Sequence, residues 1–245
     1  MPPRTRNLYD PKSKTPYKLS RSKIELFVRC PRCFYFDRRV GVGRPQGPAF
    51  TLNVAVDTLL KKEFDVHRAK QTAHPLMRAY GLKAVPFAHE EIDVWRENFK
   101  GLQFHHEASN FLVTGAIDDV WIGADKQLIV VDYKATSKKD EVNLDSPWQM
   151  SYKRQMDIYQ WLLRQNGFKV AKRAYFVYVN GRADLEAFDG KLEFKVALLP
   201  YDGNDVWINQ TLLKMRKCLR ASKAPKAAGD CEYCGYVKAL TITQK

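Results

Sequence analysis

Two apolar segments separated by a short polar turn limit the folds open to this chain more than any other feature. The first is "FLVTGAIDDVWIG" at residues 111–123, and the second is "QLIVVDYKAT" at residues 127–136. Segments rich in Val, Ile and aromatic residues and bounded by Gly, Asp and Lys are typical of paired strands. The sequence therefore predicts a β-hairpin over residues 111–136.

The register of this hairpin decides which charged side chains meet. If the hairpin is symmetric about residue 125, Asp118 lies opposite Asp132, with Cβ atoms about 5 Å apart. Lys134 shares the face of Asp132, whereas Asp119 and Tyr133 point the other way. Two facing carboxylates repel each other, and a divalent cation would remove that conflict. The pattern indicates a cation site; the alternative is a solvent-facing strand end with unrelated charges.

Other segments carry helix and strand signals. Apolar residues at helical spacing in "FTLNVAVDTLLKKEFDVHRAK" predict a helix at residues 50–70. Capping residues predict three further helices: a short helix from Ser20 or Ser22 that Pro31 ends or redirects, a long helix from Pro147 to Gly167, and a helix at about residues 204–221. Two strands are predicted at residues 173–179 and 191–199, separated by an Asn180-Gly181 turn and a polar loop. Residues 70–104 carry no pattern that assigns them.

The charge of the chain indicates a polyanionic partner. Its 245 residues include 41 Lys and Arg against 27 Asp and Glu, a formal net charge of +14. An excess of this size is typical of nucleic-acid-binding proteins, and a merely cationic surface is the alternative. No apolar run approaches the roughly 20 residues that span a membrane, and the N-terminus lacks the apolar core of a signal peptide. We therefore expect no membrane association and a cytoplasmic location.

Four of the five cysteines form two Cys-x-x-Cys pairs, Cys30 with Cys33 and Cys231 with Cys234. In a cytoplasmic chain such pairs are more typical of a metal centre than of disulfides. Because about 200 residues separate them, a shared metal would hold the two ends of the chain together. The spacing suits Zn²⁺ or an iron–sulfur cluster, with four buried thiols as the alternative. Cys218 lies in an amphipathic segment and is expected in the core.

Three short motifs follow one another through the hairpin and the long helix. They are Gly115 with Asp118, Asp132 with Lys134, and Gln155 with Tyr159. In this order they resemble the RecB-like branch of the PD-(D/E)XK nuclease superfamily, which includes the nuclease domains of RecB and AddB and the CRISPR-associated RecB-like exonucleases. The resemblance implies an α/β, restriction-endonuclease-like core, a central mixed sheet flanked by helices, with a helical N-terminal segment and a Cys-containing C-terminal segment.

The resemblance also implies which residues bind metal. Asp118 and Asp132 would hold Mg²⁺ or Mn²⁺, and the backbone carbonyl of Tyr133 would add a ligand. The branch usually carries a further metal-binding histidine on an upstream helix, and here that position is Asp57. Aspartate is a good ligand for hard cations, so the site would contain three carboxylates. Glu63 is a second candidate.

Three more residues receive roles from the same resemblance. Lys134 would orient or activate the attacking water and stabilise charge in the transition state. Gln155 and Tyr159, one helical turn apart, would brace the site or contact DNA. The alternative for these two residues is a structural role, with Tyr159 as a core aromatic and Gln155 as its exposed neighbour. His105 and His106 are near the hairpin and receive no role.

The cysteine segments "CPRCFYF" and "CEYCGY" resemble that branch as well. Many of its members hold a [4Fe–4S] cluster between the chain ends, with one N-terminal and three C-terminal cysteines. Here the cysteines divide two and two, so Cys33 would replace a C-terminal ligand. On this resemblance we expect [4Fe–4S] at Cys30, Cys33, Cys231 and Cys234, with Zn²⁺ as the alternative.

The predicted organisation is a flexible basic arm at residues 1–18 and one nuclease domain at residues 19–245. That domain has a mainly helical part at 19–110, a catalytic core at 111–200, and a C-terminal helix and Cys motif at 201–245. The expected activity is metal-dependent hydrolysis of DNA, as an exonuclease on ends or single strands, in repair or CRISPR adaptation. The alternatives are a non-enzymatic nucleic-acid-binding module with structural Zn²⁺, to which an acidic cluster would be of no use, and an RNA-processing nuclease.

Overall fold

The computed structural model describes residues 3–45, 47 and 50–243, and the chain divides into two compact units. Unit 1 contains the described residues of 1–48, 103–114 and 206–245. Unit 2 contains those of 49–102 and 115–205. Unit 1 is therefore assembled from three separate parts of the sequence, and unit 2 from two.

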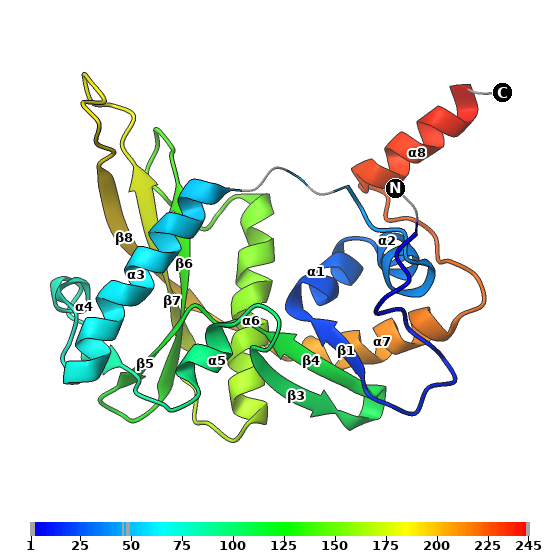
Figure 1. The fold of residues 1–245 in the computed structure, drawn as a ribbon, viewed down its shortest axis with the longest axis horizontal. Helices are drawn as coiled ribbons and strands as arrows, with labels where there is room; N and C mark the ends of the chain where they lie inside the picture. Colours follow the sequence, from blue (N-terminus) through cyan, green and yellow to red (C-terminus); the bar gives the residue numbers. More distant parts are fainter. Residues whose placement is uncertain (1–2, 46, 48–49, 244–245) are drawn as a thin grey trace. The chain divides into compact units, whose positions relative to one another are not determined.

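Unit 2 is built on a five-stranded mixed sheet with the order β2-β5-β6-β7-β8 (Figure 1). Its strands are β2 (Ala84–Pro86), β5 (Asp119–Gly123), β6 (Leu128–Thr136), β7 (Arg173–Gly181) and β8 (Phe194–Asp202). β6 and β7 run parallel, whereas the other neighbouring pairs are antiparallel. Parallel neighbours need a crossover connection, and the helix α6 (Met150–Gln165) supplies it. The structure confirms the predicted mixed α/β class.

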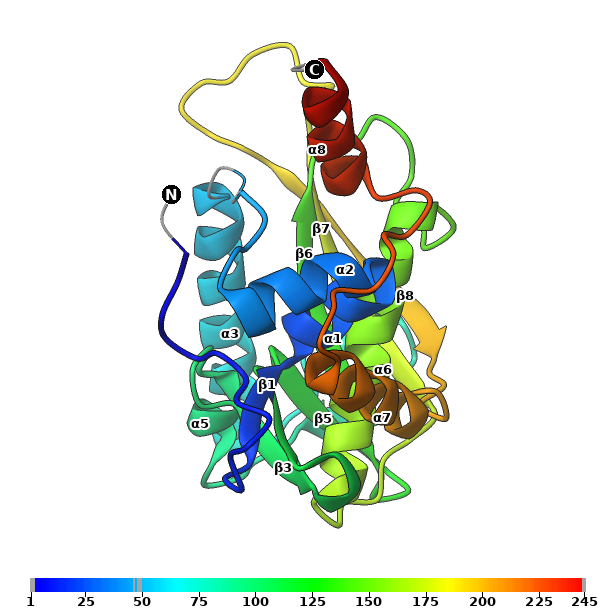
Figure 2. The same ribbon diagram turned by 90° about the vertical axis from the view of Figure 1, so that its right-hand side faces the viewer.

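The predicted register of the hairpin is confirmed. β5 pairs with β6 so that Asp119 lies opposite Val131 and Ile122 lies opposite Leu128, which is symmetric about residue 125. Side chains along β6 alternate between two faces. Tyr133 packs in the core beneath the helix α3 (Thr51–Lys70), so Asp132 faces the other side of the sheet, toward α6. Figure 2 shows α3 and α6 on opposite sides of these strands.

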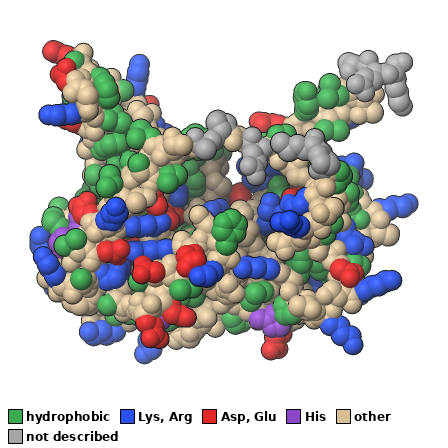
Figure 3. All heavy atoms as spheres, viewed as in Figure 1, with side chains coloured by type: hydrophobic (Ala, Val, Ile, Leu, Met, Phe, Trp, Pro, Cys, Tyr) green, Lys and Arg blue, Asp and Glu red, His purple; other side chains and the backbone are tan. Residues whose placement is uncertain are grey.

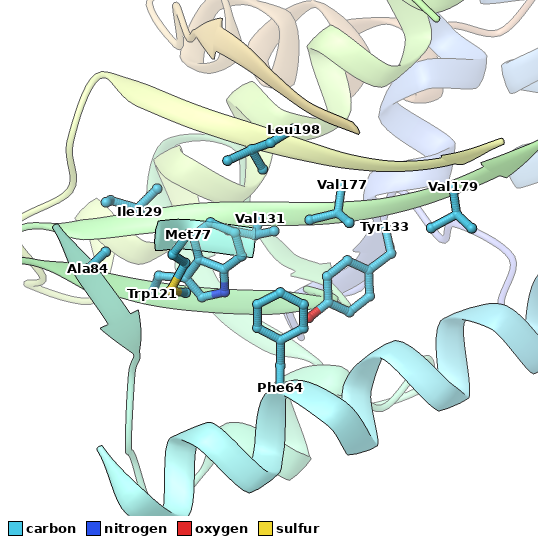
Figure 4. Packing of buried hydrophobic residues seen from close by; sticks show 10 residues of the cluster. All are labelled: Phe64, Met77, Ala84, Trp121, Ile129, Val131, Tyr133, Val177, Val179 and Leu198. Carbon is cyan, nitrogen blue, oxygen red and sulfur yellow. The ribbon is translucent and has the colours of Figure 1, made fainter. Parts of the chain in front are cut away.

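Aromatic stacking fixes α3 on the sheet of unit 2. Phe64 is fully buried, and its ring stacks on Trp121 with centroids 5.3 Å apart and lies 5.7 Å from the ring of Tyr133. Figure 4 shows Phe64 projecting from α3 toward both rings. Burial of a side chain of this size contributes about 1.5–3 kcal/mol, so α3 is held where its N-terminal half can reach the end of β6.

Unit 1 combines a three-stranded sheet, β1-β4-β3, with helices from both ends of the chain. Its elements are β1 (Tyr17–Ser20), α1 (Arg21–Arg29), α2 (Pro31–Tyr35), the π-helix η1 (Phe36–Val40), β3 (Leu102–His106), the 3-10 helix η2 (Glu107–Ser109), β4 (Phe111–Gly115), α7 (Ile208–Arg220) and α8 (Glu232–Thr243). β1 and β4 are parallel, with Tyr17 opposite Phe111. Cys218, expected in the core, lies partly buried on α7.

The remaining helices of unit 2 are short. They are α4 (Pro75–Ala79), α5 (Ile92–Arg96) and the 3-10 helix η3 (Pro147–Gln149), and the first two lie in the stretch that the sequence left unassigned. The helices predicted at residues 50–70 and from Pro147 are confirmed as α3 and as η3 with α6. No helix in the described part of the chain has the length and apolar character needed to cross a membrane.

One predicted strand is divided in the structure. The segment at residues 111–123 forms β4, which ends at Gly115, and β5, which begins at Asp119, and these strands belong to different sheets. Gly115 lies against α6, where an added Cβ would be 2.8 Å from Cε1 of Tyr159. The absence of a side chain at this position therefore allows α6 to pack closely where the chain passes from one sheet to the other.

The predicted turn at Asn180-Gly181 is wrong. Both residues are paired within the sheet, Asn180 with Lys195 and Gly181 with Phe194, and the loop follows at residues 182–193. Asn180 instead uses its side-chain amide on the segment after β6. It accepts a hydrogen bond from the backbone N–H of Lys138 at 2.8 Å and donates one to the Lys138 carbonyl at 3.0 Å.

The N-terminal segment makes contacts within unit 1. Residues 1–2 of the predicted arm lie outside the described residues. Arg4 donates its backbone N–H to the Gly41 carbonyl at 2.9 Å and pairs with Asp37 at 3.1 Å. The ring of Tyr9 meets that of Tyr17 edge to face, with centroids 5.3 Å apart. These contacts place the described part of the segment against η1 and β1.

Candidate functional site

Asp132 is the central polar residue at the end of β6. Its side chain is fully buried, and its Oδ2 forms an ion pair with Lys134 Nζ. Gln155 Nε2, on α6, donates to Asp132 Oδ1 at 2.8 Å and to the Tyr159 hydroxyl oxygen at 3.0 Å. Burial raises the pKa of Asp132 and Asp118 raises it further, while Lys134 opposes the rise. Gln155 therefore orients a carboxylate whose charge is balanced by Lys134.

Asp118 approaches β6 from the residue just before β5. Its Oδ2 accepts a hydrogen bond from the backbone N–H of Tyr133 at 3.0 Å, and its own carbonyl accepts one from Arg96 Nε at 3.1 Å. The side chain is 22% exposed. The carboxylate is thus fixed beside β6 by a backbone donor and still has a solvent-facing side.

The helix α3 brings Asp57 to the same group of side chains. Lys61 Nζ lies 2.8 Å from Asp57 Oδ2 and 3.5 Å from Asp118 Oδ1. Burial raises the pKa of Asp57, and Asp118 adds to the rise, while Lys61 and Lys134 lower it. The sequence reading missed Lys61, although its position four residues after Asp57 places both on one helix face. An ammonium therefore bridges two carboxylates from different elements.

The three aspartates offer oxygen ligands of the kind that Mg²⁺ and Mn²⁺ prefer. The position of Lys61 between Asp57 and Asp118 shows that positive charge is favourable there. The three carboxylates do not form a compact set of ligands. Among the described residues, the cysteine group alone has three or more Cys, His, Asp or Glu ligand atoms within 4.8 Å of one another. A cation shared by Asp57 and Asp118 would therefore have to replace Lys61.

A buried network of hydrogen bonds and ion pairs surrounds Asp119, the residue after Asp118. Asp119 is fully buried on the opposite face, as the strand alternation predicts, and its Oδ2 accepts a hydrogen bond from the Tyr133 hydroxyl at 2.7 Å. Arg68 and Arg96 both pair with Asp119 Oδ1. These arginines come from α3 and α5, so sequence spacing gave no signal of them. The network ties both helices to the strands that carry the site.

The other sequence candidates lie in different surroundings. Glu63 is 59% exposed, and its Oε1 lies 2.8 Å from His74 Nε2 rather than beside the aspartates. His105 lies 3.1 Å from the Asn110 side chain, and His106 lies 2.8 Å from the Ser109 hydroxyl.

The four cysteines of the two Cys-x-x-Cys pairs come together in unit 1. The Sγ atoms of Cys30 and Cys234 are 3.9 Å apart, and Cys33 Sγ lies 3.6 Å from those of both Cys231 and Cys234. Each pair begins a helix, α2 after Cys30 and α8 after Cys231. Backbone N–H groups at helix N-termini favour the thiolate form, which is the form that binds metals.

A cation lies beside this group. Arg44 Nη2 donates to Cys231 Sγ at 3.3 Å, and the guanidinium lies 4.6 Å from the centroid of the Tyr233 ring. Burial alone would raise the pKa of Cys30, but hydrogen bonds from the backbone near Ala228 and Cys33 lower it to about 6. The net shift is opposite at two other cysteines of the group, where burial raises the pKa of Cys33 and of Cys234.

A motif of two aspartates and a lysine at adjacent strand ends, braced from a crossover helix, defines a class of metal-dependent phosphodiester hydrolases. A family model of the PD-(D/E)XK nuclease superfamily matches residues 18–239. The chain belongs to this superfamily.

Comparisons with individual proteins add the following. No curated protein matches. Among solved structures, the crystal structure of SSO0001 is similar at 14% identity and a TM-score of 0.39, over 93% of this chain and 86% of that one. The family assignment therefore rests on the family model.

Proposed function

We propose that the chain is a Mg²⁺- or Mn²⁺-dependent deoxyribonuclease of the RecB-like branch that acts as an exonuclease on DNA ends or single strands. The observation that carries this proposal is the placement of Lys134 against the buried Asp132, beside Asp118 and under the brace of Gln155. A cation-binding carboxylate pair with an adjacent ammonium is what hydrolysis of a phosphodiester requires.

In this proposal each residue has a defined task. Asp118, Asp132 and Asp57 would hold the divalent cation with the carbonyl of Tyr133. The bound cation would neutralise charge on the phosphate and lower the pKa of the attacking water. Lys134, whose side chain is 14% exposed, would hold that water and stabilise negative charge on the phosphate oxygens.

Two residues support those that react. Gln155 keeps Asp132 Oδ1 in a fixed orientation through its hydrogen bond, and the Tyr159 hydroxyl holds Gln155 in turn. Gln155 is 7% exposed and Tyr159 is 3% exposed. Burial of both favours the bracing role over contact with DNA.

Charge supports a nucleic-acid substrate. The chain carries a formal net charge of +14, and Lys and Arg side chains are distributed over the surface shown in Figure 3. A protein that only bound nucleic acid would lose affinity by placing Asp57, Asp118 and Asp132 together, because carboxylates repel phosphate. This disfavours the binding-module alternative, whereas an RNA-processing nuclease would use the same site.

DNA repair and CRISPR adaptation, in the cytoplasm, are the settings in which we expect the enzyme.

The cysteine group supports a second, structural metal. Tetrahedral Zn²⁺ with Zn–S bonds of about 2.3 Å places its sulfur ligands about 3.8 Å apart. Three of the six Sγ–Sγ separations are 3.6–3.9 Å, and all four Sγ atoms lie within 4.8 Å of one another, which fits this arrangement. A [4Fe–4S] cluster has a core of iron and sulfide between its ligands and would require the four sulfurs to stand further apart. We therefore infer Zn²⁺ in place of the cluster that the family resemblance suggests.

The test of the nuclease proposal is digestion of end-labelled single-stranded and duplex DNA, and of RNA of the same sequence. Each substrate is incubated with Mg²⁺, Mn²⁺ or EDTA. We expect DNA to be shortened from its ends with either metal and to stay intact in EDTA. Cleavage that persists in EDTA, or that is confined to RNA, would contradict the proposal.

The matched variants are Lys134→Ala and Lys139→Ala, which each remove one lysine from the same part of the chain. Lys134→Ala should abolish cleavage while DNA binding in EDTA is retained, because few phosphate contacts are lost. Lys139→Ala should cleave as the wild type does. Full activity of Lys134→Ala would remove the catalytic assignment.

A further inference from the structure

Next to Lys134 lies a row in which two aromatic side chains stand between two lysines. We call it the lysine–aromatic row: Lys134, Tyr152, Trp148 and Lys138. Lys134 Nζ lies 4.7 Å from the centroid of the Tyr152 ring. That ring meets the ring of Trp148 edge to face, with centroids 5.4 Å apart. Lys138 Nζ lies 4.6 Å from the centroid of the Trp148 ring. The row therefore leads directly away from the proposed catalytic lysine.

The backbone that carries Trp148 is held in place. Trp148 lies in η3, where Ser146 and Gln149 form a capping box. Gln149 is fully buried, and its Nε2 donates to the Tyr178 hydroxyl oxygen at 3.3 Å and to the Asn143 carbonyl. Trp148 itself is 49% exposed. The residue next to it is thus buried and bonded while the indole is presented to solvent.

The backbone of Lys138 is also held in place. Its backbone N–H and carbonyl both bond to the side-chain amide of Asn180, at 2.8 and 3.0 Å. This reciprocal pair fixes the chain just beyond the end of β6. The backbone is therefore held in place on both sides of the contact between Lys138 and Trp148.

The row also continues into the proposed active site through α6. Tyr152, Gln155 and Tyr159 occur at positions i, i+3 and i+7 and so share one face of that helix. Gln155 bonds to Asp132 from this face. A strand lying along the row would accordingly reach Lys134 and Asp132 at its end.

We propose that Trp148 is a base-stacking residue for an unpaired DNA strand, with Lys138 contacting the phosphate beside the stacked base. Proteins that bind single strands combine aromatic stacking surfaces with lysines or arginines along the backbone, and the row has both. In duplex DNA the faces of interior bases are covered by their neighbours, so stacking on Trp148 selects unpaired nucleotides. This inference rests on the proposed nuclease function, whose substrate class it narrows to single-stranded DNA.

The test measures binding without cleavage, by fluorescence anisotropy in EDTA. The probes are a labelled 20-nucleotide single-stranded DNA and a strand of equal length and charge in which abasic sites replace the central nucleotides. Three variants are compared with the wild type. Trp148→Leu removes the ring, Trp148→Phe retains one, and Phe188→Leu alters another exposed aromatic, which is 71% exposed and lies outside the row.

Loss of one stacked base should weaken binding of Trp148→Leu to the normal strand at least about 5-fold, with much smaller change on the abasic strand. Trp148→Phe should recover most of the affinity, and Phe188→Leu should bind as the wild type does. Equal losses on both strands, or no loss on either, would overturn the inference. If Trp148→Leu does not fold, the affinities of the wild type for the normal and the abasic strand still test the inference, because equal affinities would exclude stacking.

The same variants separate this inference from the proposed function. If DNA is never cleaved but Trp148→Leu loses affinity for the normal strand alone, the stacking assignment stands and the nuclease proposal fails. If the wild type cleaves single-stranded DNA and Trp148→Leu binds and cleaves equally well, the nuclease proposal stands and the stacking assignment fails.

Discussion

Lys61 holds two carboxylates together that would otherwise repel each other. Its Nζ lies 2.8 Å from Asp57 and 3.5 Å from Asp118, where a divalent cation would compete with it. Lys61→Met should therefore bind Mn²⁺ more tightly than the wild type, by a few-fold to about tenfold, since a competing unit charge is removed from a partly exposed site. The measurement is calorimetric titration with Mn²⁺ in the absence of DNA. Lys62→Met, a change at the exposed neighbouring lysine, is the matched control.

Asp57→Asn should change the same titration in the opposite direction. The amide keeps the size of the side chain but removes one negative charge from the oxygen ligands, so Mn²⁺ and Mg²⁺ should bind more weakly. Indistinguishable titrations of the wild type and Asp57→Asn would show that α3 contributes no ligand. Weaker binding by Lys61→Met would show instead that the lysine supports the cation.

At the scale of secondary-structure elements, the contact between α6 and the end of β4 tolerates no side chain. A Cβ added at Gly115 would lie 2.8 Å from Tyr159 Cε1 and 2.9 Å from Leu162 Cδ1. Gly115→Ala should lower the free energy of unfolding by about 1–3 kcal/mol through overpacking and should displace the tyrosine that holds Gln155. Urea denaturation measures the first effect and DNA cleavage the second. Gly229→Ala, where an added Cβ meets no atom within 4 Å, should leave both unchanged.

Asp37 links the N-terminal segment, α1 and η1 of unit 1 by charge. Arg4, Lys23 and Arg38 all pair with its nearly buried carboxylate. Burial acts to raise the pKa of Asp37, but hydrogen bonds from Arg38 and Lys23 outweigh it and lower the pKa to about 2. Because the folded-state pKa is below the unfolded value, this carboxylate stabilises the fold above about pH 4, and the contribution is lost as the pH falls toward 2.

Asp37→Asn should therefore cost about 2 kcal/mol of unfolding free energy at pH 7 and clearly less at pH 3. The measurement is urea denaturation of both proteins at the two pH values. A cost that does not change with pH would mean that packing and neutral hydrogen bonds, rather than the charge, explain the loss.

Local patterns predicted the elements that form from neighbouring residues. The hairpin register, α3 and α6 follow from alternation, helical spacing and caps, which the sequence displays directly. The sequence did not reveal that one strand divides at Gly115, because this depends on Tyr159 and Leu162, over 40 residues away. It also misassigned Asn180, whose partner is the backbone of Lys138 rather than a turn.

The proposed site likewise contains residues that a local pattern predicts and residues that come together only through long-range packing. Asp118, Asp132 and Lys134 are placed together by strand pairing, which a register prediction can supply. Lys61 bridges α3 to the hairpin, and Arg68 and Arg96 reach Asp119 from separate helices. Such long-range partners depend on how the elements pack, which a single sequence does not specify.

At the scale of the whole molecule, the cysteine group sets the expected metal content. Purified protein should contain one zinc per chain and no iron, and should be colourless under anaerobic conditions, since four sulfurs within 4.8 Å of one another suit one tetrahedral ion. The measurement is elemental analysis with a visible absorption spectrum. A brown protein with several irons per chain would establish a cluster instead.

Removal of that ion should affect the two ends of the chain together. Cys234→Ser removes one ligand, and we expect protease sensitivity to rise in both the segment around Cys30 and the segment around Cys231. Cys218→Ser, a change at the cysteine outside the group, is the control. A wild-type cleavage pattern in Cys234→Ser would mean that the ends are held without metal.

The discontinuity of unit 1 has a consequence for the order in which the protein is made. All residues of the proposed active site fall between positions 57 and 159, within unit 2, and emerge from the ribosome well before Cys231 and Cys234. Unit 1 combines residues that precede unit 2 in the sequence with residues that follow it. A nascent chain can therefore assemble the sheet that carries Asp132 while Cys30 and Cys33 still await their partners. Metal binding by the cysteine group would then follow the formation of the sheet that carries the proposed active site.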